Sequence, residues 1–334
     1  MSGISTTQTD KKVIPLEKRE RVIAAIRGEA VDHVPCGFSL HFPKSVTAHE
    51  AVVKEHLDFF TQTDTDIAKI MNENLLNIGR PISTLEELAQ LPHVDLRPLI
   101  DRQAELTRDI KAQCDPQLFL LGTLHGICAS SIHPMETQGM EYLTARNFIL
   151  NGLRQNEAAV LPVLEAVCDW LCEFAKSYAQ AGVDGIYYAS LGGERDLLTD
   201  EEFEKWIKPF DLRVMQTIRE TGCYCFLHIC KDGLNMERYR DFAPLADVVN
   251  WGIYEAPCSL EEGKKLFGDC TIMGGLPNRS GVMTEGTQEQ LDDAVRQLVS
   301  EKGKTKFILG ADCTLPSEIS WSRIRSISDT VHTI

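Results

Sequence analysis

The sequence predicts an α/β protein of the (β/α)8, or TIM, barrel class. Eight short apolar segments have the character of buried strands, and helical patterns separate most of them, which favours a closed barrel over an open doubly wound sheet. No G-x-G-x-x-G segment lies between a strand and a helix, which argues against a dinucleotide-binding sheet. The expected strands begin near His33, Asp66, Leu118, Val183, Cys223, Ala246, Cys270 and Lys306.

The first half of the chain opens with a helical pattern over residues 15–27 that ends near Gly28. Pro35 then leads into a short apolar strand, where proline is tolerated because it stands at the strand's start. Residues 118–127 are almost continuously apolar, as expected of a strand buried on both faces. The other expected elements are strands over 36–41 and 66–71, helices over 46–60 and 99–113, and a long helical region over 136–182.

In the second half, residues 160–181 have a strong amphipathic pattern that stops at Gly182. Thr199 is a good N-cap for a helix that reaches about residue 221. Strand and helix alternate from there to the end of the sequence. Strands are expected over 183–190, 223–230, 246–254, 270–276 and 306–313, and helices over 236–242, 259–267, 288–302 and 316–331.

Length and patterning indicate one domain. The 334 residues contain no internal repeat and no low-complexity linker, and they are enough to bury the core of one elaborated barrel. We therefore expect a single barrel over residues 15–334. Residues 1–14 are polar and rich in Ser and Thr, and are expected to form a disordered tail.

Composition excludes several classes of function. Lys and Arg number 34 against 49 Asp and Glu, a formal charge of −15 without any basic cluster, so nucleic acid is not an expected partner. No apolar run approaches the roughly 18–20 residues needed to cross a bilayer, so membrane insertion is not expected either. Eleven cysteines are spread along a chain without an apolar leader, which is typical of a protein of the reducing cytoplasm.

Three residues stand out as metal ligands. His228 and Cys230 lie two apart at the end of an expected strand, so both side chains point to the same face. Cys313 ends the last expected strand, across the mouth of the barrel. Two thiolates and an imidazole suit Zn²⁺, with a fourth position left open in a catalytic site. The alternative is that His228 and Cys230 simply pack in the core, as a buried His beside a buried Cys often does.

Other polar residues at strand ends are candidates for substrate contacts, because the chemistry of a barrel lies at the carboxyl ends of its strands. The alternative for each is a polar residue satisfied at the barrel rim. Cys223 and Cys225 have the opposite parity to His228 and are expected to pack against the helices. The substrate-contact candidates are Tyr188, Glu194, Asn250 and His125.

Four segments together resemble a known family. They are residues 21–29 with Asp-His-Val-Pro at 32–35, the strand over 182–186, Leu-His-Ile-Cys at 227–230, and the ending over 309–316. The chain is similar to the uroporphyrinogen decarboxylase superfamily, and within it to the zinc-containing cobamide-dependent methyltransferases such as methylcobamide:coenzyme M methyltransferase. The resemblance implies that His228, Cys230 and Cys313 hold zinc and carry the catalysis.

The resemblance also implies a reaction. A methyl group would pass between a corrinoid, carried on a partner protein, and a small acceptor or donor, with a zinc-activated thiol as the favoured acceptor. Three alternatives stay open: a demethylating enzyme that takes methyl from a methyl ether or similar donor onto Co(I), a decarboxylase, and a non-catalytic zinc-stabilised barrel subunit. Residues 37–43 lack the arginines that a porphyrinogen decarboxylase uses to hold its substrate. Lys231 and Asp312 replace glycines that are common in the family.

Overall fold

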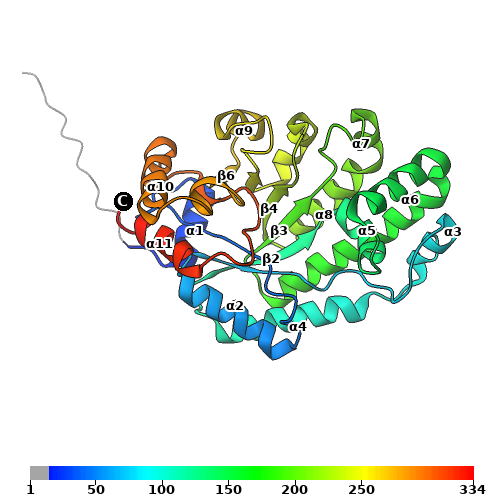
Figure 1. Ribbon diagram of the computed structural model, residues 1–334, viewed down its shortest axis with the longest axis horizontal. Helices are drawn as coiled ribbons and strands as arrows, with labels where there is room; N and C mark the ends of the chain where they lie inside the picture. The colour runs from blue at the N-terminus through cyan, green and yellow to red at the C-terminus, as the bar shows by residue number, and fades with distance from the viewer. Residues whose placement is uncertain (1–14) are drawn as a thin grey trace, which may run out of the picture.

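The centre of the molecule is a parallel sheet of seven strands in the order of the sequence, β1-β2-β3-β4-β5-β6-β7. The computed structural model describes residues 15–334, and the expected tail over residues 1–14 lies outside them. Figure 1 shows the strands in the middle of the molecule, with helices outside them. The strands are β1 (Ile67–Ile70), β2 (Phe119–His125), β3 (Gly185–Ser190), β4 (Tyr224–Ile229), β5 (Val248–Trp251), β6 (Thr271–Leu276) and β7 (Phe307–Ala311).

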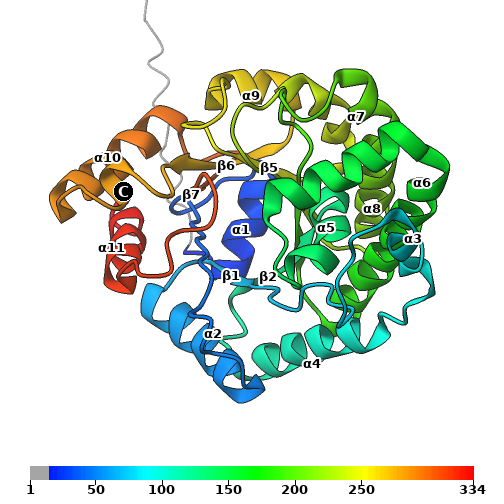
Figure 2. The ribbon, with the colours of Figure 1, turned by 45° about the vertical axis from the view of Figure 1, so that its right-hand side comes forward.

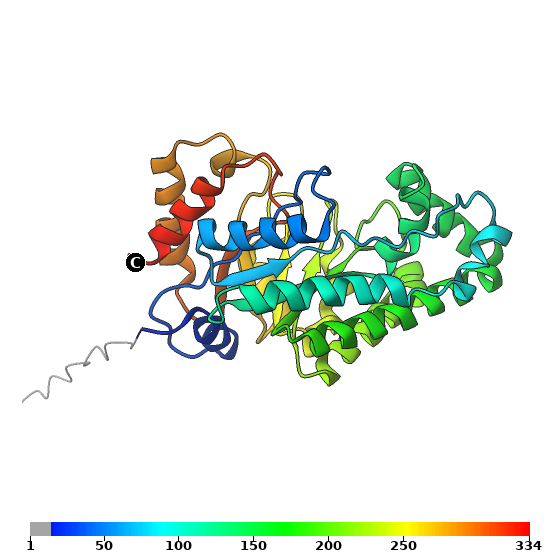
Figure 3. The ribbon, with the colours of Figure 1, turned by 90° about the horizontal axis from the view of Figure 1, so that it is seen from below.

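The helices form an outer ring around the strands, except for α1, which lies at the centre of the ring in Figure 2. In Figure 3, α2 and α4 lie on either side of β1. The helices are α1 (Lys18–Arg27), α2 (His49–Thr63), α3 (Leu85–Leu88), α4 (Arg97–Gln113), α5 (Ile127–Glu136), α6 (Tyr142–Ala181), α7 (Asp200–Trp206), α8 (Lys208–Glu220), α9 (Leu260–Phe267), α10 (Gln288–Lys302) and α11 (Trp321–Val331). Three 3-10 helices are η1 (Leu91–His93), η2 (Met236–Leu245) and η3 (Gly281–Met283).

The first expected strand, over residues 36–41, is not a regular strand. Cys36 and Leu40 instead make isolated parallel bridges to Leu309 and Leu315. The amide of Gly37 donates to the carbonyl of Leu309 at 3.0 Å, and the amide of Ile67 donates to the carbonyl of Cys36 at 3.2 Å. The segment therefore touches both β7 and β1, but its ladder is broken because the amide of Cys36 donates to the Asp66 side chain. The structure thus has seven strands, and a complete eight-stranded barrel stays a prediction.

Two expected helices are interrupted. In the region over 136–182, α5 ends at Glu136 and α6 begins only at Tyr142, and α6 itself has a non-helical residue at Asn156 (φ −151°, ψ 72°). The helix expected from Thr199 is split at Ile207 into α7 and α8, where a proline occupies the first turn of α8. Proline lacks the amide that would continue the ladder of the preceding turn. The N-cap itself is confirmed, since Thr199 forms a capping box with Glu202.

Helix α1 closes the amino-terminal end of the sheet. Its residues Val22, Ala25 and Ile26 are buried in one cluster with the inward side chains of the strands, including Phe119 and Phe226. Alternate residues of each strand supply this inner cluster, whereas the residues between them pack against the outer helices. Among the described residues, none of the helices is long and apolar enough to span a membrane.

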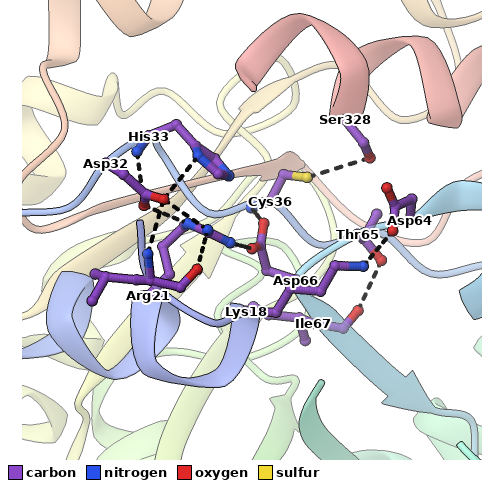
Figure 4. A network of polar contacts seen from close by, with 11 residues as sticks. Lys18, Arg21, Asp32, His33, Cys36, Asp64, Thr65, Asp66, Ile67 and Ser328 are labelled. Carbon is purple, nitrogen blue, oxygen red and sulfur yellow. Dashed lines mark hydrogen bonds and ion pairs between the residues drawn. The ribbon is translucent and has the colours of Figure 1, made fainter. Parts of the chain in front are cut away.

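A network of charged groups fixes α1 to the start of the sheet (Figure 4). The buried Arg21 donates to the Asp32 carboxylate at 2.7 and 2.9 Å and to the Asp66 carboxylate at 2.5 Å. Asp66 in turn accepts the amide of Cys36 at 2.8 Å. The other side of Cys36 faces Ser328 of α11, with 3.6 Å between sulfur and hydroxyl. The first and last parts of the chain are thereby joined beneath the sheet.

His56 links α2 to the end of β1 and must be neutral to do so. Its Nδ1 donates to the carbonyl of Val52 at 2.7 Å, and its Nε2 accepts the amide of Met71 at 3.1 Å. The side chain is buried, and burial lowers the pKa of His56 to about 4. Because the unfolded pKa is near 6.5, folding opposes protonation of this ring between about pH 6.5 and 4.

We expect the free energy of unfolding to fall as the pH drops through this window. For His56 alone the loss amounts to about 1.4 kcal/mol per pH unit, or about 3 kcal/mol in total. Urea unfolding at pH 7, 5.5 and 4.5 would measure it. In His56→Gln the loss with falling pH should be smaller than in the wild type, whereas in the exposed-residue control His93→Gln it should be unchanged. Equal pH dependence in His56→Gln and wild type would contradict this assignment.

Candidate metal centre

The structure brings His228, Cys230 and Cys313 together at the carboxyl ends of β4 and β7. One ligand atom from each lies within 4.8 Å of the other two, and no other such group of three His, Cys, Asp or Glu occurs within residues 15–334. His228 lies on β4 at the inward parity of Phe226, Cys230 directly follows β4, and Cys313 lies two residues beyond β7. Residues 83 positions apart in the chain therefore share one site.

The geometry of the two sulfurs fits one metal ion. Their separation is 3.8 Å, far beyond the bond length of a disulfide, and both cysteines are free. Two sulfurs each about 2.3 Å from a tetrahedral zinc ion lie about 3.8 Å apart. In addition, neither ring nitrogen of the buried His228 has a hydrogen-bond partner in the protein. An unpartnered buried imidazole beside two sulfurs is the arrangement that a soft divalent metal completes.

A hydrogen bond between the two thiols shifts their pKa values in opposite directions. A hydrogen bond from Cys230 lowers the pKa of the Cys313 thiol well below its usual value, and the same hydrogen bond raises the pKa of Cys230. The hydrogen bond thus favours the thiolate form of Cys313 over that of Cys230. The thiolate is the form that metal ligation requires.

The backbone turns sharply directly after Cys230. Lys231 has φ +84°, in the left-handed region where a non-glycine residue costs about 1–2 kcal/mol. The amide of Cys230 donates to the carbonyl of Ser190 at 3.2 Å, and the Lys231 ammonium lies 4.1 Å from the centroid of the Tyr142 ring. This conformation explains why glycine is compatible with the position, and the contact with Tyr142 holds Lys231 in place.

The tyrosine that reaches the site is Tyr187, not Tyr188. Tyr188, expected to contact substrate, is fully buried on the helix-facing side of β3, where its hydroxyl donates to Asp211 of α8. Tyr187 has the inward parity and stacks on His228, with ring centroids 5.1 Å apart and planes inclined by 23°. Tyr187 therefore faces the metal centre and Tyr188 faces α8, although the two tyrosines are adjacent at the same strand end.

Asn250 does lie beside the metal centre, where it pairs in register with His228. Its side-chain oxygen accepts the Tyr187 hydroxyl at 2.7 Å, and its side-chain nitrogen donates to the carbonyls of Met273 at 3.0 Å and Ala311 at 3.1 Å. These contacts give hydrogen-bond partners to both the oxygen and the nitrogen of the Asn250 side-chain amide. Asn250 therefore supports the interior of the sheet, and a direct contact with substrate stays a prediction.

The other two substrate candidates lie elsewhere on the rim. The Glu194 carboxylate is paired with the buried Arg146 at 2.9 Å and also accepts the amide of Gly192. His125 ends β2 and lies edge-on to His133, with centroids 5.1 Å apart. Burial lowers the pKa of His125 to about 4, so its ring is neutral at pH 7.

Two further buried charged groups lie near the centre, and one of them, Lys69, was not among the residues expected there. Lys69 points inward from β1, donates to the Ser39 hydroxyl at 3.2 Å, and lines a cavity of about 20 Å³ together with Cys313. Burial lowers the pKa of Lys69 to about 8. Asp312, next to Cys313, accepts the amide of Tyr254 at 3.0 Å, and burial raises its pKa to about 7. A lysine inside the apolar segment over residues 67–70 was the signal in the sequence that could have identified Lys69.

The comparisons with known proteins agree with this architecture. The family model described as uroporphyrinogen decarboxylase (URO-D) matches residues 70–334, a span that includes His228, Cys230 and Cys313. The chain belongs to the URO-D family. The resemblance inferred from the four sequence segments is thereby confirmed, and the match begins after the helix and short segment that close the amino-terminal side of the sheet. Among curated proteins, none matches the sequence.

Solved structures with the same fold include methyl-transferring enzymes. A methyltransferase from Methanosarcina mazei superposes with a TM-score of 0.73 at 15% identity, covering 95% of this chain and 99% of that one. A B12-independent methionine synthase from Shewanella sp. W3-18-1 has a TM-score of 0.55 at 13% identity, covering 90% and 97%. A putative vitamin-B12-independent methionine synthase from Listeria monocytogenes has the same score and identity, covering 97% and 99%. At these identities the likeness establishes the fold.

Metal analysis of cysteine variants tests the centre. We expect about one zinc per chain in the purified wild type, and a loss of at least about tenfold in zinc affinity for Cys230→Ser and for Cys313→Ser, because each removes a thiolate ligand. Competition with a chromophoric chelator would measure the affinities. Cys114→Ser is the matched control, since Cys114 lies at the end of α4 with its sulfur near the Lys111 carbonyl. Zinc affinity that is unchanged in both site variants would contradict the assignment.

Proposed function

We propose that this protein is a zinc-dependent methyltransferase that moves a methyl group between a corrinoid and a small acceptor or donor, with a thiol as the favoured acceptor. The observation that supports this most is the cluster of His228, Cys230 and Cys313 at the carboxyl end of the sheet, in a chain of the URO-D family. The fold shared with the Methanosarcina mazei methyltransferase adds support. We place the reaction within a complete (β/α)8 barrel formed by one domain over residues 15–334.

The side chains of the centre suit this task. A hydrogen bond from Cys230 favours the thiolate form of Cys313, and the ring nitrogens of His228 have no competing hydrogen bond among residues 15–334. Zinc held by these three residues would lower the pKa of an acceptor thiol and keep its sulfur nucleophilic. Two sulfur ligands keep the centre electron-rich, which favours nucleophilic chemistry over strong polarisation of an oxygen. Cys230 and Cys313 are only partly buried, which leaves room for an acceptor to reach a metal held there.

The methyl carrier is proposed to be a corrinoid bound to a partner protein. The corrinoid would supply or receive the methyl group at cobalt. The given sequence contains no D-x-H-x-x-G segment of the kind that binds cobalamin, and we place the carrier on a partner protein. Such a partner would approach the carboxyl end of the sheet, because Cys230 and Cys313 follow the carboxyl ends of β4 and β7. The reducing cytoplasm, in which free cysteines persist, is the proposed location.

A demethylating enzyme is the second candidate. It would use the same three residues with the methyl group moving from a methyl ether or similar donor to Co(I), and zinc would then act on the leaving oxygen. The buried acid Asp312, with pKa raised to about 7, favours this version because it stands next to Cys313 and can exchange a proton near neutral pH. A decarboxylase and a non-catalytic zinc-stabilised subunit are the remaining alternatives.

A demethylation assay separates these candidates. We expect the purified protein to demethylate methylcobalamin in the presence of one class of small thiol, and a chelator to abolish turnover. Tetrahydrofolate and aryl methyl ethers, the latter with Co(I) cobalamin, belong in the same panel. Absorbance changes of the corrinoid report each reaction directly.

Substitution of the proposed metal ligands tests whether the activity in this assay depends on the metal centre. His228→Ala and Cys313→Ala should lose metal and activity together, by at least about 100-fold in rate, because the acceptor is no longer activated. Transfer from a methyl ether alone would select the demethylating version. If porphyrinogen decarboxylation occurs and survives both substitutions, or if zinc is bound but no substrate of the panel reacts, the proposed transfer is wrong.

A further inference from the structure

We propose that Tyr187 is a positioning residue that holds the imidazole of His228 in its metal-binding orientation by stacking. This inference rests on the proposed zinc centre and extends it to residues that do not touch the metal. It explains how a histidine ligand can be oriented in this chain without the hydrogen bond that usually does so.

A metal-binding histidine normally donates its second ring nitrogen to a carboxylate, a carbonyl or water, which fixes both the tautomer and the ring orientation. His228 lacks such a partner among residues 15–334, since both of its nitrogens are buried and unbonded. The nearby Asp312 does not supply it, because one of its oxygens accepts the amide of Tyr254 and the other has no partner. A packing contact with a neighbouring side chain can set the ring instead.

The phenol ring of Tyr187 makes a contact of this kind. The two rings are stacked, with centroids 5.1 Å apart and planes inclined by 23°. The side chains come from adjacent strands, because Tyr187 lies on β3 and His228 on β4. A face-to-face arrangement restricts rotation of the imidazole about its second torsion angle, the motion that would take its nitrogens away from the sulfurs.

Tyr187 is itself fixed at two points, which makes it a rigid support. Its hydroxyl donates to Asn250 at 2.7 Å, and the ammonium of Lys69 lies 3.5 Å from the centroid of its ring. Lys69 comes from β1 and His228 from β4, so they approach from strands on opposite sides of β3 in the sheet. The cation–π contact gives a buried ammonium a favourable neighbour, since Ser39 is its one hydrogen-bond partner within residues 15–334.

The same support reaches the other half of the centre. Asn250 donates to the carbonyl of Ala311, the last residue of β7 and two residues before Cys313. Tyr187 thus joins His228 on one strand, through Asn250, to the strand end that carries Cys313. Movement of the phenol ring would disturb both the imidazole and the separation between the two strand ends.

Metal affinity and the spectrum of the cobalt-substituted protein test this role. In Tyr187→Met, whose flexible side chain fills the space without stacking, we expect Co²⁺ and Zn²⁺ to bind about 10–100-fold more weakly and the visible Co²⁺ bands to shift. Tyr187→Phe keeps the stacked ring and should bind within about fivefold of the wild type, with the wild-type spectrum. Tyr178→Met, at a buried tyrosine of α6, controls for general loss of packing and should leave affinity and spectrum unchanged.

The outcomes distinguish this inference from the proposed function. A wild type that binds no zinc or cobalt would overturn the metal centre itself. A wild type that binds metal, together with a folded Tyr187→Met that binds it equally well and with the same spectrum, would overturn only the role of Tyr187. If Tyr187→Met does not fold, Lys69→Met is the variant that tests the inference. Removing the cation from the phenol ring should weaken the binding of Co²⁺ and Zn²⁺ at least threefold. Unchanged metal affinity in Lys69→Met would contradict the inference.

Discussion

The metal centre depends on the register of four neighbouring parallel strands. β4, β5, β6 and β7 pair in sequence order, and this pairing places the end of β4 and the end of β7 so that the sulfurs of Cys230 and Cys313 lie 3.8 Å apart. A shift of one residue in any of these pairs would reverse the facing of β4 relative to β7, so that His228 and Cys313 would no longer share one side of the sheet, because successive side chains of a strand face opposite ways. The catalytic proposal therefore rests on backbone hydrogen bonds at a distance from the metal ligands.

Polar groups inside the sheet stabilise that arrangement because almost all of them are paired. Tyr187, Asn250 and the carbonyls of Met273 and Ala311 form one chain of hydrogen bonds across the interior. At the opposite end, Arg21 joins Asp32 and Asp66 beneath the sheet and leaves the ligand end open. The two nitrogens of His228 are conspicuous against this background, since they remain unbonded where the sulfurs converge. Burying these nitrogens without hydrogen bonds costs free energy, and metal binding to His228 would offset that cost.

Strand periodicity was sufficient to predict seven of the strands and the inward direction of His228. It was not sufficient for Tyr187 and Tyr188, because two adjacent aromatic residues look alike in a strand that is buried on both faces. The segment over residues 36–41 was also apolar enough for a strand, but the Asp66 side chain takes the amide of Cys36, a contact between distant residues that no local pattern contains. The pairing of Glu194 with Arg146 is of the same kind. Convergence of Cys313 with His228 followed from the barrel hypothesis, not from spacing.

X-ray absorption at the zinc K-edge of the purified protein is the most direct test of the central claim. The account predicts two sulfur ligands at about 2.3 Å, one imidazole nitrogen at about 2.0–2.1 Å, and one light-atom ligand that a thiol substrate replaces with a third sulfur. A centre without sulfur ligands, or one with four protein ligands that is unchanged by every thiol offered, would contradict it.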